Sequence, residues 1–120
     1  MNLMSKHEIN EVWTSLKLNE AGLIPAVAID VKSNEILMHA WMNKEAFENT
    51  LTTGEVTYYS RSRKKLWVKG EESGNKQFLI EMKLDCDKDT LLLKVDQKGN
   101  ACHTGAHSCF DENLIWSKNE

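Results

Sequence analysis

The sequence predicts a single small α+β domain, with a mainly antiparallel sheet and two helices. Three observations lead to this prediction. Two short amphipathic segments begin at helix-capping residues, the other apolar runs are short and strand-like, and turn residues separate them. A chain of 120 residues corresponds to one domain, and neither an internal repeat nor a low-complexity linker divides it. We therefore expect one domain over residues 1–120, with a polar tail over 111–120.

Both predicted helices have recognisable ends. Ser5 can cap the first helix, with Glu8 at the capping-box position. The helical period then places four apolar residues on one face: Ile9, Val12, Trp13 and Leu16. Asn43 can cap the second helix, and Gly54 ends it.

Six further runs are expected to be strands. They cover residues 23–31, 35–42, 56–60, 66–68, 78–84 and 90–95. The first two flank a turn at 32–34 and form a predicted hairpin. Pro25 falls at the start of the first run, where the missing backbone N–H is tolerated.

Composition excludes several classes of protein. The net charge of -3 and the pI near 5.8 do not give the basic surface typical of nucleic-acid binding. No apolar run approaches the ~20 residues of a membrane span, and the first residues lack the apolar core of a signal peptide. Three cysteines cannot all pair within one chain. We therefore expect a cytoplasmic protein with free thiols, without nucleic-acid or membrane partners.

The segment Asp85-Cys86-Asp87-Lys88-Asp89 is rich in metal-ligand chemistry. In an extended chain the three aspartates would face one way and Cys86 the other. Thiolate sulfur suits zinc, and clustered carboxylates suit magnesium. An acidic hairpin turn with a chance cysteine remains the alternative.

A second segment, Cys102-His103-Thr104-Gly105-Ala106-His107-Ser108-Cys109, carries the other two cysteines. Together with Cys86 it offers three thiolates, and catalytic zinc commonly has three protein ligands and an open position. The two histidines leave a closed site of Cys and His ligands as an alternative.

Two other known metal-binding motifs do not fit the sequence. Asp85, Asp87 and Asp89 resemble the start of an EF-hand loop, but Thr90 stands where that loop needs glycine, and strands flank it. A nucleobase deaminase needs His-x-Glu, and residues 39–41 read His-Ala-Trp.

Two loops carry donors suited to phosphate, because arginine binds phosphate through two hydrogen bonds and glycine allows close backbone approach. The candidates are Arg61, Arg63, Lys69, Ser73, Gly74 and Asn75. A pair of solvated hairpin loops is the alternative.

Several of these motifs, in this order, resemble phosphoribosyl-AMP cyclohydrolase. They lie over residues 22–26, 40–43, 58–63, 66–71, 73–75, 85–87, 102–105 and 108–110, so the resemblance covers about 22–110. It implies an enzyme of histidine biosynthesis that adds water at purine C6 of phosphoribosyl-AMP. The product would be the phosphoribosyl-formimino-aminoimidazole carboxamide ribotide. No fused pyrophosphohydrolase domain is expected, because the chain stops soon after Phe110.

The resemblance also implies a ligand set and an assembly. Residues matching Cys86, Cys102 and Cys109 bind one zinc per chain, and those matching Asp85, Asp87 and Asp89 bind magnesium. An intertwined homodimer is implied. We expect its zinc sites to be shared, with Cys86 from one chain and Cys102 and Cys109 from the other.

Two positions depart from the family pattern. Glu72 replaces an expected small hydroxyl residue, and Ala106-His107 replaces a pair that is often basic.

The mechanism follows from zinc chemistry. Zinc lowers the pKa of bound water to about 7, and three thiolates should weaken this effect. A nearby base should then matter, and His103, next to a ligand, is the candidate catalytic residue. Its alternative role is a hydrogen bond to a metal ligand. A zinc-stabilised binding module without catalysis remains the alternative of a different class.

Overall fold

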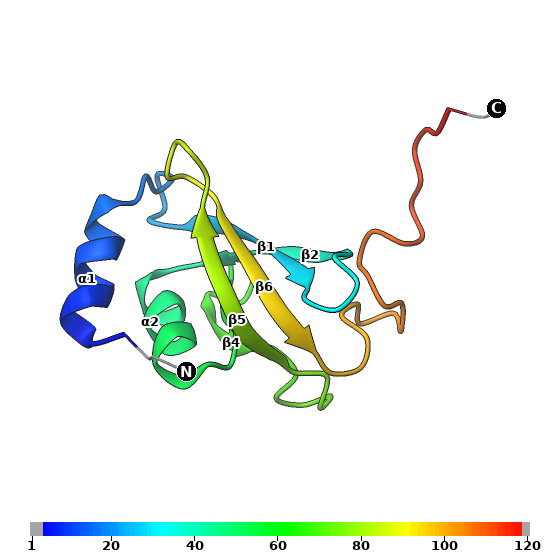
Figure 1. Ribbon diagram of the computed structural model, residues 1–120, viewed down its shortest axis with the longest axis horizontal. Helices are drawn as coiled ribbons and strands as arrows, with labels where there is room; N and C mark the ends of the chain where they lie inside the picture. Colours follow the sequence, from blue (N-terminus) through cyan, green and yellow to red (C-terminus); the bar gives the residue numbers. More distant parts are fainter. Residues whose placement is uncertain (1–3, 119–120) are drawn as a thin grey trace.

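The computed structural model describes residues 4–118 (Figure 1). The helices and strands follow the predicted order: α1 (Lys6–Ser15), β1 (Ile24–Asp30), β2 (Ile36–Met42), α2 (Lys44–Thr53), β3 (Thr57–Ser60), β4 (Lys65–Val68), β5 (Gln77–Leu84) and β6 (Leu91–Gln97). Within these residues, all six expected strands and both expected helices are confirmed. None of the described helices is long and apolar enough to cross a membrane.

Local sequence signals explain where both helices begin. The Ser5 hydroxyl accepts the N–H of Glu8 at 3.2 Å, and the Glu8 carboxylate accepts the N–H of Ser5 at 3.0 Å, so the predicted capping box is present. The Asn43 side chain accepts the N–H of Ala46 at 2.9 Å. Gly54 ends α2 in the left-handed conformation, with a φ of 80°.

Four strands form the main sheet in the order β2-β1-β6-β5, and β3 and β4 form a separate hairpin. β1 pairs with β2 and β5 pairs with β6 in antiparallel fashion, whereas β1 and β6 are parallel. The fold is therefore mainly antiparallel, as predicted, with one parallel pair at the centre of the main sheet.

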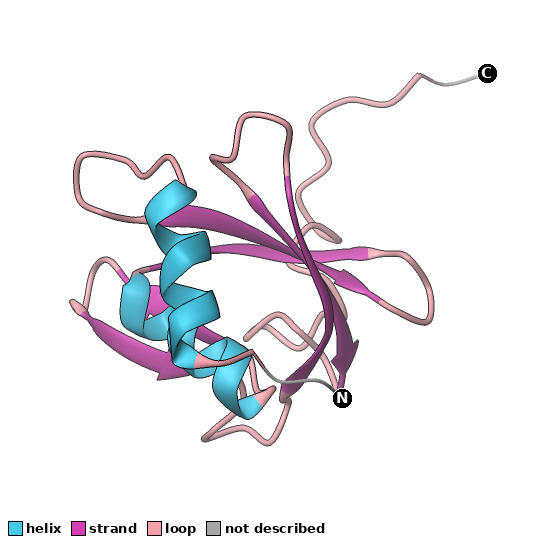
Figure 2. Ribbon diagram, turned by 60° about the vertical axis from the view of Figure 1, so that its left-hand side comes forward, coloured by secondary structure: helices cyan, strands magenta, loops and turns pink. Residues whose placement is uncertain are grey.

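The helices cover one face of the main sheet (Figure 2). The side chains of β1 and β6 that point to this face are buried, and α1 and α2 meet above them through Trp13 and Phe47, whose ring centroids are 5.2 Å apart. The core therefore lies between the helices and the sheet.

The opposite face of the main sheet, called the outer face here, carries apolar side chains that the helices do not cover. Strand register places Val27 beside Leu92, and Ile29 beside Ile36. Ile36 is 51% exposed and Leu92 is 40% exposed, and Pro25, Val27 and Ile29 are half-buried. An apolar surface thus crosses three adjacent strands.

Candidate functional site

The turn between β5 and β6 closes through its backbone. The N–H of Lys88 donates to the carbonyl of Asp85 at 3.0 Å, and Lys88 has a φ of 62°. Asp85 Oδ1 also accepts the backbone N–H groups of Asp89 at 3.0 Å and Thr90 at 3.3 Å. Because the segment is a turn, the alternation expected for an extended chain does not apply to it.

The turn nevertheless gathers the three predicted carboxylates. One oxygen each from Asp85, Asp87 and Asp89 lies within 4.8 Å of the other two, and all three residues are exposed. The backbone N–H of Asp89 lowers the pKa of the Asp85 carboxyl. A hydrogen bond shared with Asp85 raises the pKa of Asp89, and the charges of Asp85 and Asp87 add to this rise. Such crowded carboxylates suit a divalent cation that prefers oxygen ligands.

The second predicted segment folds into a compact loop after β6. The N–H of Ala101 donates to the carbonyl of His107 at 3.0 Å, and the N–H of Cys102 donates to that of Ala106 at 3.1 Å. The loop is fastened to β2, because the N–H of Cys109 donates to the carbonyl of Leu37 at 2.7 Å. Ser108 is buried, and its hydroxyl donates to the carbonyl of Ile36 at 2.6 Å.

The thiols of Cys102 and Cys109 lie together in this loop. A hydrogen bond with the Thr104 hydroxyl, 3.0 Å away, lowers the pKa of the Cys102 thiol, and contact with Cys109 also lowers it. Burial raises the pKa of the Cys109 thiol, and contact with Cys102 adds to this rise. Two adjacent soft donors in one loop are half of a tetrahedral zinc site.

Lys69 joins the hairpin to the thiol loop. Its ammonium donates to the carbonyl of Ala101 at 2.8 Å, and burial lowers its pKa. The charges of Cys109 and Cys102 oppose this effect. Lys69, predicted to bind substrate, therefore already contacts the backbone beside Cys102.

Cys86 does not lie near the other two cysteines within the described chain. It belongs to the turn before β6, and the thiol loop follows the other end of β6 (Figure 1). A strand of seven residues spans roughly 20 Å, since each residue rises about 3.3 Å. A zinc–sulfur bond is only about 2.3 Å long. One zinc cannot contact all three cysteines of a single chain in this conformation.

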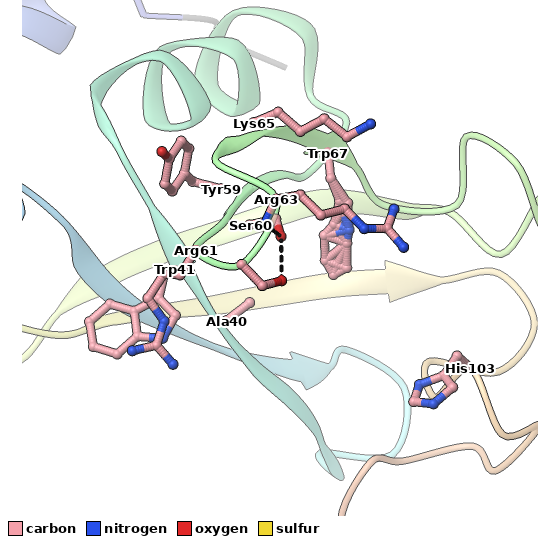
Figure 3. A pocket seen from close by; sticks show the side chains of 10 residues that line it. Ala40, Trp41, Tyr59, Ser60, Arg61, Arg63, Lys65, Trp67 and His103 are labelled. Carbon is pink, nitrogen blue, oxygen red and sulfur yellow. Dashed lines mark hydrogen bonds between the residues drawn. The ribbon is translucent and has the colours of Figure 1, made fainter.

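A cavity of about 870 Å³ opens between β2, the β3–β4 hairpin and the thiol loop (Figure 3). Ten described residues line it, and none of them is acidic: Ala40, Trp41, Tyr59, Ser60, Arg61, Ser62, Arg63, Lys65, Trp67 and His103. The structure thus brings the predicted residues Arg61, Arg63 and His103 to one cavity. The Arg61 guanidinium lies 4.5 Å from the centroid of the Trp41 ring.

A smaller cavity of about 300 Å³ adjoins the large one along β4 and shares Arg63, Lys65, Trp67 and His103 with it. Lys69 and Ser73 line it, together with His103. Gly74 and Asn75 line neither cavity. The turn holding them is tightly closed, because a Cβ at Gly70 would lie 2.4 Å from the backbone carbon of Asn75.

The two histidines of the thiol loop have different surroundings. His107 Nε2 lies 3.3 Å from Asp30 Oδ2 and 3.4 Å from Glu35 Oε1, at the β1–β2 turn. His103 is exposed and lines both cavities. Of the pair that departs from the family pattern, His107 therefore contacts carboxylates of its own chain.

The sequence reasoning did not select the aromatic residues or Lys65 as parts of the site. Trp41, Tyr59 and Trp67 were assigned to strands and to the family motifs, without a role in the site. Alternation along β4 places Lys65 and Trp67 on one face, but it does not reveal that this face borders the thiol loop.

Comparison with known proteins assigns the family. The family model described as Phosphoribosyl-AMP cyclohydrolase matches residues 38–111. A protein of that name from Acidiphilium cryptum is 62% identical over 99 residues, which cover 82% of this chain and 85% of the relative. One from Rhodococcus jostii is 57% identical over 104 residues, covering 87% and 91%.

A third relative of the same name, from Alkalilimnicola ehrlichii, is 56% identical over 110 residues, covering 92% of this chain and 78% of the relative. The family match covers more than half of the chain and includes the β5–β6 turn, the cavity and the thiol loop. This chain belongs to the phosphoribosyl-AMP cyclohydrolase family.

Proposed function

We propose that this protein is a metal-dependent hydrolase of histidine biosynthesis that opens the adenine ring of phosphoribosyl-AMP. The observation that carries the proposal is the large cavity beside the thiol loop. Its lining combines cations and aromatic rings, and His103 is common to the cavity and the loop. The names of the relatives support the choice of substrate.

The reaction adds one water to the purine and breaks one ring bond. The water oxygen forms a bond to C6, and the C6–N1 bond breaks. One proton of the water passes to the exocyclic nitrogen, which becomes the amide nitrogen, and the other passes to N1. No oxidant or further reactant is needed.

Residues of the cavity would bind the substrate and handle its protons. Arg61 and Arg63 supply guanidinium groups for phosphate, and no acidic residue opposes them among the described lining residues. Histidine is the side chain that most often serves as a general base near neutral pH, and His103 lines the cavity where such a base is needed. In the proposal it accepts a proton from the attacking water and returns a proton to a purine nitrogen.

The donors present fit two different metals. Cys102 and Cys109 are adjacent thiols that suit zinc, and the oxygens of Asp85, Asp87 and Asp89 suit magnesium. When bound, zinc would supply activation of water at neutral pH. The aspartate turn would order the site or help hold phosphate rather than activate water, because magnesium dehydrates reluctantly.

A site with three thiolates would require two chains. Cys86 lies about 20 Å from the thiol loop along β6. In a symmetric dimer with antiparallel β6 strands, the aspartate turn of one chain would meet the thiol loop of its partner. Two equivalent sites would form, one at each end of the paired strands.

The outer face supports such a dimer. Its apolar side chains, among them Val27, Ile29 and Leu92, lie between the two halves of the metal site. A two-fold axis in the plane of this face and perpendicular to β6 would bury them and align the chain ends as required. A dimer formed by hydrogen bonds along the edge of β5 is less favourable, because a bulge at Ile80 makes that strand irregular.

An absorbance assay tests the proposed function. Phosphoribosyl-AMP is mixed with the zinc-loaded protein, and opening of the purine is followed by the change of its ultraviolet chromophore. We expect turnover that a chelator abolishes and added zinc restores. A zinc-loaded, folded protein that binds phosphoribosyl-AMP but leaves its absorbance unchanged would indicate a binding module and contradict the proposal.

A further inference from the structure

Trp67 lies where the two cavities of the site meet. The larger cavity, of about 870 Å³, and the smaller one, of about 300 Å³, share the lining residues Arg63, Lys65, Trp67 and His103. Trp67 is the aromatic residue common to both linings. In Figure 3 its indole stands between the arginine-bearing β3–β4 turn and the loop of His103.

A buried hydrogen-bond network holds this indole. Its ring centroid lies 5.2 Å from that of Tyr58, with an interplanar angle of 39°. Tyr58 is fully buried, and its hydroxyl donates to Gln77 Oε1 at 2.7 Å. Gln77 Nε2 in turn donates to Gln97 Oε1 at 2.8 Å. Tyr58, which packs against the indole, is therefore itself held by buried residues of two other strands.

The indole also lies close to the thiol loop. The Lys69 ammonium is 5.9 Å from the centroid of the Trp67 ring and donates to the carbonyl of Ala101, which precedes Cys102. The other tryptophan of the large cavity, Trp41, is less suited to receive a ligand, because the Arg61 guanidinium lies 4.5 Å from its ring centroid, closer than the Lys69 ammonium lies to that of Trp67. Trp67 thus offers an aromatic surface near both the thiols and His103.

We propose that the purine of the substrate stacks on Trp67, an inference that rests on the proposed function for the identity of the substrate. An N1-substituted adenine is electron-poor, and the electron-rich face of an indole favours such a ring. N1 and N9 lie on opposite sides of the purine, and each carries a phosphoribosyl group. The purine on Trp67 directs one arm to Arg61 and Arg63 and the other toward Lys69 and Ser73.

Calorimetry with two probes tests this role. AMP carries the base and one phosphate, and ribose 5-phosphate carries the phosphate without the base. Loss of base stacking by a side-chain truncation costs about 1–3 kcal/mol, or roughly 5- to 150-fold in affinity. We expect Trp67→Leu to weaken AMP binding by that factor and leave ribose 5-phosphate unchanged.

Two further variants separate stacking from folding. Trp67→Phe keeps a ring and should recover most of the AMP affinity. Trp116→Leu removes a tryptophan that is 76% exposed on the tail and should behave as wild type. With phosphoribosyl-AMP, Trp67→Leu should raise KM, and Trp67→Phe should reverse most of that rise.

Several results would overturn the proposal. Undiminished AMP binding by Trp67→Leu, equal losses for both probes, or a Phe variant as defective as the Leu variant would each do so. No AMP binding by the wild type at millimolar concentrations would do so too. A different result would separate the two proposals. If Trp67→Leu weakens AMP binding but not ribose 5-phosphate binding, and the wild type does not open phosphoribosyl-AMP, the stacking role holds and the proposed function is refuted.

Discussion

Substitution of Val27 by aspartate tests whether the outer face joins two copies of the chain. Val27 is half-buried at the middle of β1, opposite His39 on β2 and Leu92 on β6. In a separate chain, the aspartate would still reach solvent on the open face. We therefore expect Val27→Asp to cost the folded chain about 1 kcal/mol, the span of strand propensities.

The cost to the proposed dimer would be much larger. Face-to-face packing would enclose two copies of the new carboxylate between the sheets. The effective penalty for burying an unpaired ion is several kcal/mol, and each 1.4 kcal/mol changes an affinity about tenfold. We expect the dissociation constant to rise by at least about 10³-fold, with loss of zinc and activity.

Sedimentation, zinc content and turnover are measured on the same preparations. Ile80→Asp is the matched control, since Ile80 is 55% exposed at the β5 bulge and lies off the outer face. We expect this variant to stay dimeric. A dimeric, zinc-replete Val27→Asp protein would refute the reasoning, and dissociation by Ile80→Asp alone would point to the β5 edge instead.

Three further predictions concern single side chains. Each of the three Cys→Ala variants should lose bound zinc, and full zinc occupancy with full activity in all of them would exclude the thiolate site. His103→Ala should lower turnover by roughly 10²–10⁴-fold while zinc stays bound. Near-normal turnover across the pH range would leave His103 without a role as a base. Tyr58→Phe removes a buried hydroxyl and leaves Gln77 Oε1 without that donor, so unfolding should be easier by about 1–3 kcal/mol. Chemical denaturation with an unchanged midpoint would contradict this.

The elements of the fold were predictable because their signals are local. The capping box of Ser5 and Glu8 and the Asn43 cap depend on residues three positions apart. The pairing of β1 with β6 is different. It joins Ala26 to Leu91, far apart in sequence, and no turn motif links the two strands.

The site was predictable in its residue types and not in its arrangement. The sequence indicated three cysteines and three aspartates as ligands, but the separation of Cys86 from the thiol loop appears only once β6 is known to lie between them. The turn at Lys88 was not predictable from the sequence either. Its left-handed conformation, with a φ of 62°, is unusual for lysine, so the residue type gives no signal for it.

Trp67 was overlooked for a related reason. Alternation gives the face of β4 on which a side chain lies, and the neighbours of that face come from a distant loop. The significance of Trp67 follows from the contact between Lys69 and Ala101, which no sequence pattern indicates.

Complementation between two inactive variants tests the central claim, a catalytic metal site built from two chains. Cys86→Ala and Cys109→Ala chains are co-expressed with different affinity tags, and doubly tagged dimers are isolated for zinc and turnover measurements. With shared sites, one site of a mixed dimer collects both defects and the other collects none. Purified mixed dimers should then retain about half of the wild-type activity, and the unsorted population about a quarter. If each site lies within one chain, every site carries one defect, and inactive, zinc-free mixed dimers would contradict the account.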